Sequence, residues 1–497
     1  MLSLSTLFFS HLETPLRLTA FPASLLAIVP MLAAVEGCGP TTSRYVLVEE
    51  SLRVGDMKRA DQIVEGAENE YGSKSRVLYK MDRGMTLHLA GRYQDSNALL
   101  EQAEEEVEQL YTRRVRTEAK AFLLNDTELP FEGEPYEQVM INVLKSINYA
   151  VLGSWDEALV ETRRIDHRLN MLSDRTGDKD GYRDDAFARY LSGILYEVTG
   201  DVNNAFIAYR KAYEGYRVAG SWSRAPLPPM LRQDLLRVTE ALPLTNEHEE
   251  YRRAFADVSW QPYSDTQRLA HVVVISYNGR APRKEDQFID LPISFDALNL
   301  VLLTKRAVGS NNPNSRAAES LLYGLSGHVV RVALPRLVPQ KTQVETGQVS
   351  LNGKSVSFSA GTELVQNLTA LAEKSLADRF TAISVKAVAR AAVKYALAEG
   401  VGRGARAAAG KDLGPLIGIL AGALARSLAI ASEEADKRSW RTLPDEVQIA
   451  RLWVPPGDYE LRIRSLGRGG GVVGQESLHA VTLSAGETKV FAERVLP

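Results

Sequence analysis

Residues 193–212, GILYEVTGDVNNAFIAYRKA, carry the pattern that decides the helical part of this fold. Small and large side chains alternate in it at fixed spacings: Gly193, Tyr196, Gly200, Ala205, Tyr209 and Ala212. Two antiparallel helices require this arrangement, because small residues lie where the helices touch and an aromatic ring fills the gap between them. A glycine then turns the chain from one helix into the next. The stretch therefore predicts a helical hairpin that turns at Gly200.

Copies of the same spacing come before this stretch. They comprise Gly84, Leu87, Gly91, Tyr93, Ser96 and Ala103, then Tyr149, Gly153, Trp155 and Ala158, and a weaker set at Gly55, Met57, Ala60 and Ala67. The pattern resembles the tetratricopeptide repeat (TPR), so we expect four stacked hairpins with insertions at 125–135 and 174–185. The resemblance implies a concave surface that binds peptides or partner proteins. The alternative is that these helices only pack against the rest of the chain.

The start of the chain resembles that of a secreted lipoprotein. An apolar run at 18–35 follows Arg17 and ends in small residues, which is typical of a signal peptide. Val35-Glu36-Gly37-Cys38 then resembles the bacterial lipobox. This resemblance implies removal of residues 1–37 and attachment of lipid to Cys38, with Gly39 compatible with the outer membrane. A lone buried cysteine on an apolar segment is the alternative.

Strand patterns begin after residue 261. Short β-branched or alternating runs lie at 271–277, 328–334, 348–351, 354–358, 446–453, 458–464, 477–483 and 488–495. Asn352-Gly353 is a strong signal for a two-residue hairpin turn. The fold class we predict is α+β, with a TPR-like α-solenoid followed by an antiparallel β-sandwich that contains a helical insertion. The predicted boundaries are 1–37 signal peptide, 38–219 repeats, 220–260 linker and helices, 261–360 first sandwich strands, 361–440 insertion and 441–497 last strands.

The insertion contains glycines at every fourth position: Gly410, Gly414, Gly418 and Gly422. Glycines at this spacing line one face of a helix and allow another helix to approach closely. Because Pro415 and Arg426 interrupt the apolar segment, we expect a helix packed within the protein. A role in the membrane is the alternative.

Three motifs together resemble a family of uncharacterised bacterial TPR lipoproteins. They are FARYLSGILYE at 187–197, NGRAPRK at 278–284 and ADKRSWRTLP at 435–444. The resemblance implies a place in the cell envelope but names no chemistry. Asp436, Arg438 and Trp440 then form either an exposed recognition cluster or contacts that hold the insertion onto the sandwich. We expect the second role, because the motif lies at a predicted domain junction.

The sequence contains residues typical of common catalytic motifs, but not at the spacing or in the structural context that those motifs require. The seven histidines contain no pair with the four-residue spacing of a helical zinc site. Gly400, Gly402 and Gly404 partly match a dinucleotide motif, but no strand precedes them. The net charge of −3 gives no global attraction to nucleic acid.

The sequence therefore predicts a protein that is not an enzyme and uses no cofactor or metal. We expect a lipid-anchored scaffold or adaptor of the cell envelope, on the periplasmic side of the outer membrane, that binds a periplasmic protein through its repeats. The alternative is a cell-wall or polysaccharide-processing enzyme whose site lies unrecognised in the β-domain.

Overall fold

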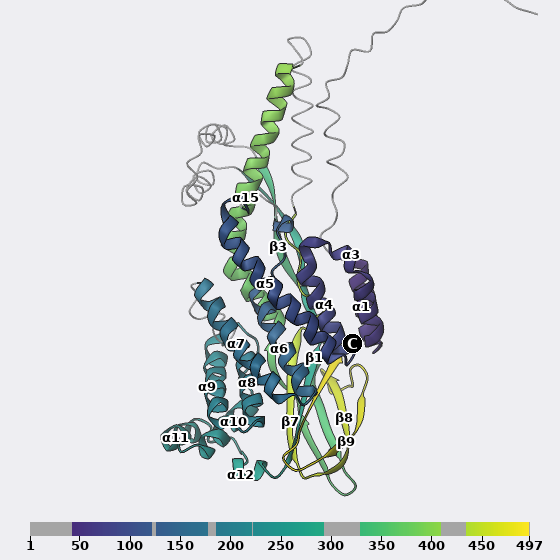
Figure 1. Cartoon of the computed structure of the whole chain (residues 1–497), viewed down its shortest axis with the longest axis vertical. Helices are drawn as coiled ribbons and strands as arrows, with labels where there is room; N and C mark the ends of the chain where they lie inside the picture. The colour runs from purple at the N-terminus through teal and green to yellow at the C-terminus, as the bar shows by residue number, and fades with distance from the viewer. Residues whose placement is uncertain are drawn as a thin grey trace, which may run out of the picture. The chain divides into compact units, whose positions relative to one another are not determined.

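The computed structural model describes residues 42–121, 126–176, 185–220, 222–292, 329–408 and 434–496 (Figure 1). Its fold is α+β, with helices up to residue 266 followed by strands and one long helix. The predicted signal peptide at 1–37, Cys38 and the glycine-lined face at 410–422 lie outside the described residues.

Four helical hairpins make up most of the first half of the described chain. Their helices are α1 (Thr42–Arg53) with α2 (Met57–Gly66), α4 (Arg76–Leu89) with α5 (Tyr93–Ala121), α6 (Pro135–Val151) with α7 (Trp155–Thr176), and α8 (Ala186–Val198) with α9 (Val202–Ala219). The short helix α3 (Glu68–Tyr71) follows α2. Three further helices, α10 (Pro229–Ala241), α11 (Thr245–Ala254) and α12 (Tyr263–Thr266), lead into the strands.

The turns inside the hairpins share one backbone geometry. Each has a glycine at positive φ: Gly55 at +78°, Gly91 at +75°, Gly153 at +72° and Gly200 at +79°. The residue after the glycine donates its N–H to the carbonyl five residues earlier, as Asp201 does to Tyr196 and Arg92 does to Leu87, both at 2.9 Å. This left-handed cap ends a helix at the lowest cost when the residue is glycine.

The described strands form three sheets. The first has the order β10-β1-β7-β6, the second β5-β4-β8-β9, and the third pairs β2 with β3. Their bounds are β1 (Ala270–Asn278), β2 (Arg280–Pro292), β3 (Val329–Gln340), β4 (Val344–Asn352), β5 (Ser357–Gly361), β6 (Glu363–Asn367), β7 (Glu446–Val454), β8 (Gly457–Gly467), β9 (Ser477–Leu483) and β10 (Thr488–Val495). Val272 and Leu452 of the first sheet share a small core with Leu351 and Leu461 of the second. These two sheets therefore pack face to face.

The strand arrangement departs from the prediction in four places, the first of which is β2, an unpredicted strand that forms a separate sheet with β3. β10 runs parallel to β1, with Thr488 opposite His271, so the expectation of purely antiparallel strands is wrong here. A connection that crosses from one sheet to another permits parallel pairing, whereas a hairpin does not. The β4–β5 hairpin pairs Asn352 with Ser357, so its loop is 353–356 and longer than the predicted turn. The long helix α15 (Leu368–Ala408) begins only after β6, which pairs with β7.

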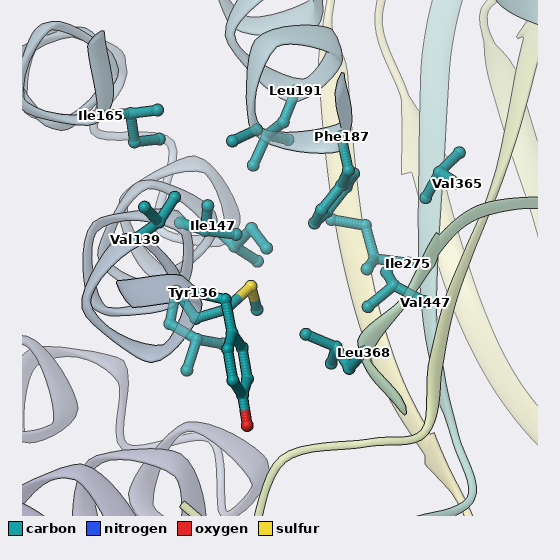
Figure 2. Close-up of a cluster of buried hydrophobic side chains, with 14 of the residues drawn as sticks. Tyr136, Val139, Ile147, Ile165, Phe187, Leu191, Ile275, Val365, Leu368 and Val447 are labelled. Atoms are coloured by element: carbon teal, nitrogen blue, oxygen red, sulfur yellow. The ribbon is translucent and has the colours of Figure 1, made fainter. Parts of the chain in front are cut away.

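The main core lies between the first sheet and the inner helices of the hairpins. Helices α4 and α6 contact β10, and α8 contacts β6. Figure 2 shows the labelled side chains of this core: Val139 and Ile147 on α6, Phe187 and Leu191 on α8, and Ile275, Val365 and Val447 on the strands. Helices α6 and α8 are buried almost all round, because α7 and α9 cover the side away from the sheet. The inner helices thus pack on the first sheet.

Candidate functional site

The predicted repeat residues lie at the contacts inside each hairpin. Tyr209 is fully buried, and a Cβ atom added to Gly193 would lie 2.3 Å from its Cδ1. Leu100 meets Gly84 in the same way, at 2.6 Å. Ala158, Ala205 and Ala212 are buried, Tyr93, Trp155 and Tyr196 are half-buried, and Gly91, Gly153 and Gly200 form the turns. These side chains pack the helices together, so the surface that faces a partner must come from other residues.

Asp436, Arg438 and Trp440 make internal contacts. The Arg438 guanidinium pairs with Asp436 at 2.7 Å and donates to the carbonyl oxygen of Leu129 at 3.0 Å. Trp440 is 1% exposed, and its backbone N–H donates to Glu137 Oε1 of α6 at 2.7 Å. The motif therefore joins segment 434–445 to the helices.

A hollow of about 470 Å³ opens between the outer helices α5 and α7, with Tyr149 of α6 also at its wall. We call it the α5–α7 hollow. The other side chains that line it are Gln94, Asn97, Ala98 and Glu101 of α5, and Glu157, Val160, Glu161 and Arg164 of α7. It lies on the outer layer of the hairpins, whereas the inner layer is occupied by the sheet.

A buried lysine of α6 forms ion pairs with glutamates of both helices that line this hollow. The Lys145 side chain is 1% exposed, and its ammonium group lies 2.9 Å from Glu104 Oε2 and 3.1 Å from Glu161 Oε2. Burial opposes the lysine charge, but Glu104 and Glu161 outweigh burial and raise the pKa of Lys145. Lys145 also bonds Glu101, which Arg164 contacts at 2.7 Å. The charges therefore fix the spacing of the helices on both sides of the hollow.

Asn97 presents an unused hydrogen-bond donor at the hollow. Its Oδ1 accepts from Asn148 Nδ2 at 2.7 Å, and the Oδ1 of Asn148 lies 2.5 Å from His88 Nδ1. These contacts fix the orientation of the Asn97 amide. Its Nδ2 is buried and has no acceptor among the described residues. Because a buried donor without a partner is unfavourable, a ligand carbonyl at this point would be stabilised.

A second buried network joins the helices to the first sheet. Arg451 of β7 bonds Glu197 of α8 at 2.9 Å and Asp234 of α10 at 2.7 Å. Arg237 bonds Glu197 at 2.6 Å and also pairs with Asp234. Burial opposes the charge of Glu197, but Arg237 and Arg451 outweigh burial and lower its pKa. Two positive and two negative groups compensate each other, so this network is a structural connection.

The sequence did not point to the α5–α7 hollow. One signal was present: Glu101, Glu104 and Glu108 share a face of one helix, and Glu161, Arg164 and Arg168 share a face of another. Only the order in which the helices pack brings Lys145 to these faces. Within the described ranges, no three histidine, cysteine, aspartate or glutamate side chains are grouped to hold a metal ion.

None of the helices in the described segments combines the length and the apolar character needed to cross a bilayer.

Comparison with known proteins adds little to this geometry. No protein-family model and no curated protein matches the chain. Among solved structures, the chain is similar in part to one titled "Crystal structure of MamA", with 13% sequence identity and a TM-score of 0.27. The alignment covers 42% of this chain and 93% of that chain.

Proposed function

We propose that this chain is a scaffold without catalytic activity, which holds an extended segment of a protein partner in the α5–α7 hollow. The observation that carries the proposal is the buried and oriented amide of Asn97 in the wall of this hollow, whose Nδ2 has no acceptor among the described residues. An extended peptide offers a backbone carbonyl in every residue, so it supplies the acceptor that Asn97 lacks.

The other groups of the hollow define the partner segment further. Val160 is apolar and 44% exposed, and it provides surface for an aliphatic side chain. Glu157 is exposed and forms no ion pair with any described residue. A segment with an aliphatic residue and a nearby lysine or arginine would satisfy both.

We also propose that the hairpins are a divergent TPR array, that the two larger sheets form a β-sandwich, and that Cys38 carries lipid. The lipobox resemblance at Val35-Glu36-Gly37-Cys38 supports the anchor, which would hold the protein on the periplasmic side of the outer membrane. Tethering raises the effective concentration of a bound partner at the membrane without any new contact.

Site-specific photocrosslinking in the native host tests the hollow. A photoreactive amino acid at Val160 is expected to capture one protein, and the same amino acid at Val218, an exposed position on α9, is not. The captured peptide is expected to contain a basic residue. Capture should decrease when Asn97→Leu, which removes the amide donor, is combined with the probe at Val160. If both probe positions gave the same products, the hollow would not be the binding site.

Labelling with a fatty-acid analogue tests the anchor separately. The wild-type chain should take up the label, and Cys38→Ala should not. Equal uptake of the label by both proteins would contradict the lipoprotein proposal. It would not bear on the proposal that the hollow binds a partner.

A further inference from the structure

Arg494 of β10 is a buried guanidinium whose hydrogen bonds are incomplete. The residue is 9% exposed, and its Nη2 donates to the carbonyl oxygen of Leu443 at 3.2 Å. Its Nε and Nη1 reach no acceptor among the described residues. Two of the three nitrogens of this side chain are therefore left without a hydrogen bond.

Three other buried arginines in the described chain have carboxylate partners. Arg237 and Arg451 share Glu197 and Asp234, and Arg438 pairs with Asp436. No carboxylate of the described residues lies within ion-pair distance of Arg494. A buried charge without a counter-charge is strongly unfavourable, so a native protein is expected to supply one.

Tyr277 adds a second unsatisfied group beside Arg494. Strands β1 and β10 pair in parallel with Tyr277 opposite Arg494. Tyr277 is completely buried, and its hydroxyl has no partner in the part of the chain that the structure describes. A hydroxyl and a guanidinium side by side can both donate to a single acceptor.

His88 of α4 borders the same place, because its ring centroid lies 5.4 Å from that of Tyr277. Its Nδ1 donates to Asn148 Oδ1, so Nε2 carries a lone pair. No described residue donates a hydrogen bond to this lone pair. Burial lowers the pKa of His88 to about 4, so the ring is neutral near pH 7. The lone pair suits a water molecule or a hydroxyl group that accompanies an anion, since it would repel the anion itself.

The surroundings are electropositive. Arg280 and Arg441 both approach Glu49 of α1, at 2.7 and 3.5 Å. Burial lowers the pKa of Arg494 to about 9, which leaves it charged at neutral pH. Glu49 lies beyond ion-pair distance of Arg494 but favours its charge, whereas the nearby Arg280 opposes it. An additional negative charge would be attracted from solution.

We propose that Arg494 and Tyr277 bind a small oxyanion, for which formate serves as the probe below. The anion supplies the counter-charge for the guanidinium and accepts hydrogen bonds from both side chains. It fastens β10 to β1 and to the segment of Leu443, at the place where α4 meets the sheet.

Thermal unfolding of the purified chain in sodium formate tests this site, with sodium gluconate at the same ionic strength as the reference. Formate is expected to raise the Tm by about 2 °C once its concentration is far above the Kd. The proton resonance of formate should broaden in the presence of the protein. Arg494→Met should abolish both effects, and Tyr277→Phe should weaken them.

Two comparisons make the result decisive. Arg462→Met on β8 removes an equal charge from a surface ion pair with Glu460, and it should leave both formate effects unchanged. Acetylglycine carries the same carboxylate on a larger molecule and should not stabilise the protein. Equal stabilisation by acetylglycine would overturn the assignment to a small ion.

The proposal fails if formate gives neither effect, or if the effects persist in Arg494→Met. Should Arg494→Met not fold, Tyr277→Phe decides the matter, because it removes only a hydroxyl that has no hydrogen-bond partner among the described residues. If the site binds no anion, this substitution is neutral or stabilising, and the change in Tm caused by formate is the same as in the wild type.

Discussion

The contact between Gly193 and Tyr209 sets how closely α8 and α9 approach. The Tyr209 ring cannot withdraw easily, because its hydroxyl donates to Glu197 Oε2 at 2.6 Å and its ring lies 5.8 Å from that of Tyr190. The hairpin therefore depends on the absence of a side chain at position 193.

We predict that Gly193→Ala lowers the free energy of unfolding by about 1–3 kcal/mol, because the new methyl group overlaps the Tyr209 ring. Urea denaturation measures the change. Gly66→Ala is the matched control, since no atom lies within 4 Å of its added Cβ. That variant should equal the wild type or gain up to about 1 kcal/mol. Equal stability of the two variants would contradict the close contact.

Glu363 makes stability depend on pH. Burial raises its pKa to about 7 from the ordinary value of 4.5, while its Oε2 accepts from Met230 N at 2.9 Å. Between these pH values the folded chain binds more protons than the unfolded chain. The stability that the group contributes is therefore complete below about pH 4.5 and is lost as the pH rises through 7.

Glu363→Gln imitates the protonated form at every pH. We expect its stability relative to the wild type to increase by about 1–3 kcal/mol between pH 5 and pH 8. Urea denaturation of both proteins at the two pH values measures this difference. A difference that is the same at pH 5 and pH 8 would show that Glu363 is not protonated in the folded protein near neutral pH.

At the scale of elements, Lys145 holds three helices in position. It lies on α6, whereas Glu104 lies on α5 and Glu161 on α7. We predict that Lys145→Met destabilises the protein by about 3 kcal/mol, because it leaves buried carboxylates without their partner. Chemical denaturation tests this value. The control is Lys489→Met on β10, whose partly exposed side chain should change stability by no more than about 0.5 kcal/mol. A small effect of Lys145→Met would mean that Arg164 suffices for these carboxylates.

The hairpins were predictable because their signals are local. Gly200 turns the chain between two consecutive helices, and Tyr209 contacts Gly193 on the preceding helix, so spacing within one hairpin identifies them. The strands β2 and β6 were missed for different reasons. Six of the 13 residues of β2, RAPRKEDQFIDLP, are charged, and a two-stranded ribbon needs no strict alternation. β6 has only five residues and runs directly into α15.

The two candidate binding sites were not predictable, because each depends on contacts between distant segments. Asn97 is a polar residue on an amphipathic helix, and the distant side chain of Asn148 occupies its Oδ1 while its Nδ2 has no acceptor among the described residues. Tyr277 and Arg494 meet through the parallel pairing of β1 and β10, which no local pattern encodes. The predicted peptide-binding face was likewise placed on the hairpins as a whole, without the sheet that occupies their inner side.

At the scale of the whole molecule, the helices and the first sheet share one core. We therefore predict a single unfolding transition for this unit, with the same midpoint by circular dichroism at 222 nm and by tryptophan fluorescence. The first signal reports the helices, and the second includes Trp440 and Trp453 near the sheet. Two separate midpoints would show that the helices and the sheets fold independently.

Arg451→Met should lower both midpoints together. Arg451 connects β7 to α8 and α10, and its loss leaves Glu197 and Asp234 with Arg237 as the remaining cation. We expect a loss of about 3 kcal/mol in the free energy of unfolding. A shift confined to one spectroscopic signal would contradict the role of this network in joining the two layers.

The packing of inner helices on a sheet also limits how such a chain can evolve. An open solenoid can lengthen by one hairpin at a time, since each repeat contacts only its neighbours. Here α4, α6 and α8 extend from edge strand β10 to edge strand β6. The contacts of these three helices thus reach both edges of the four-stranded sheet. A duplicated hairpin in the middle would displace every later helix from the strand that it contacts. Further hairpins can therefore be added only at the ends of the array.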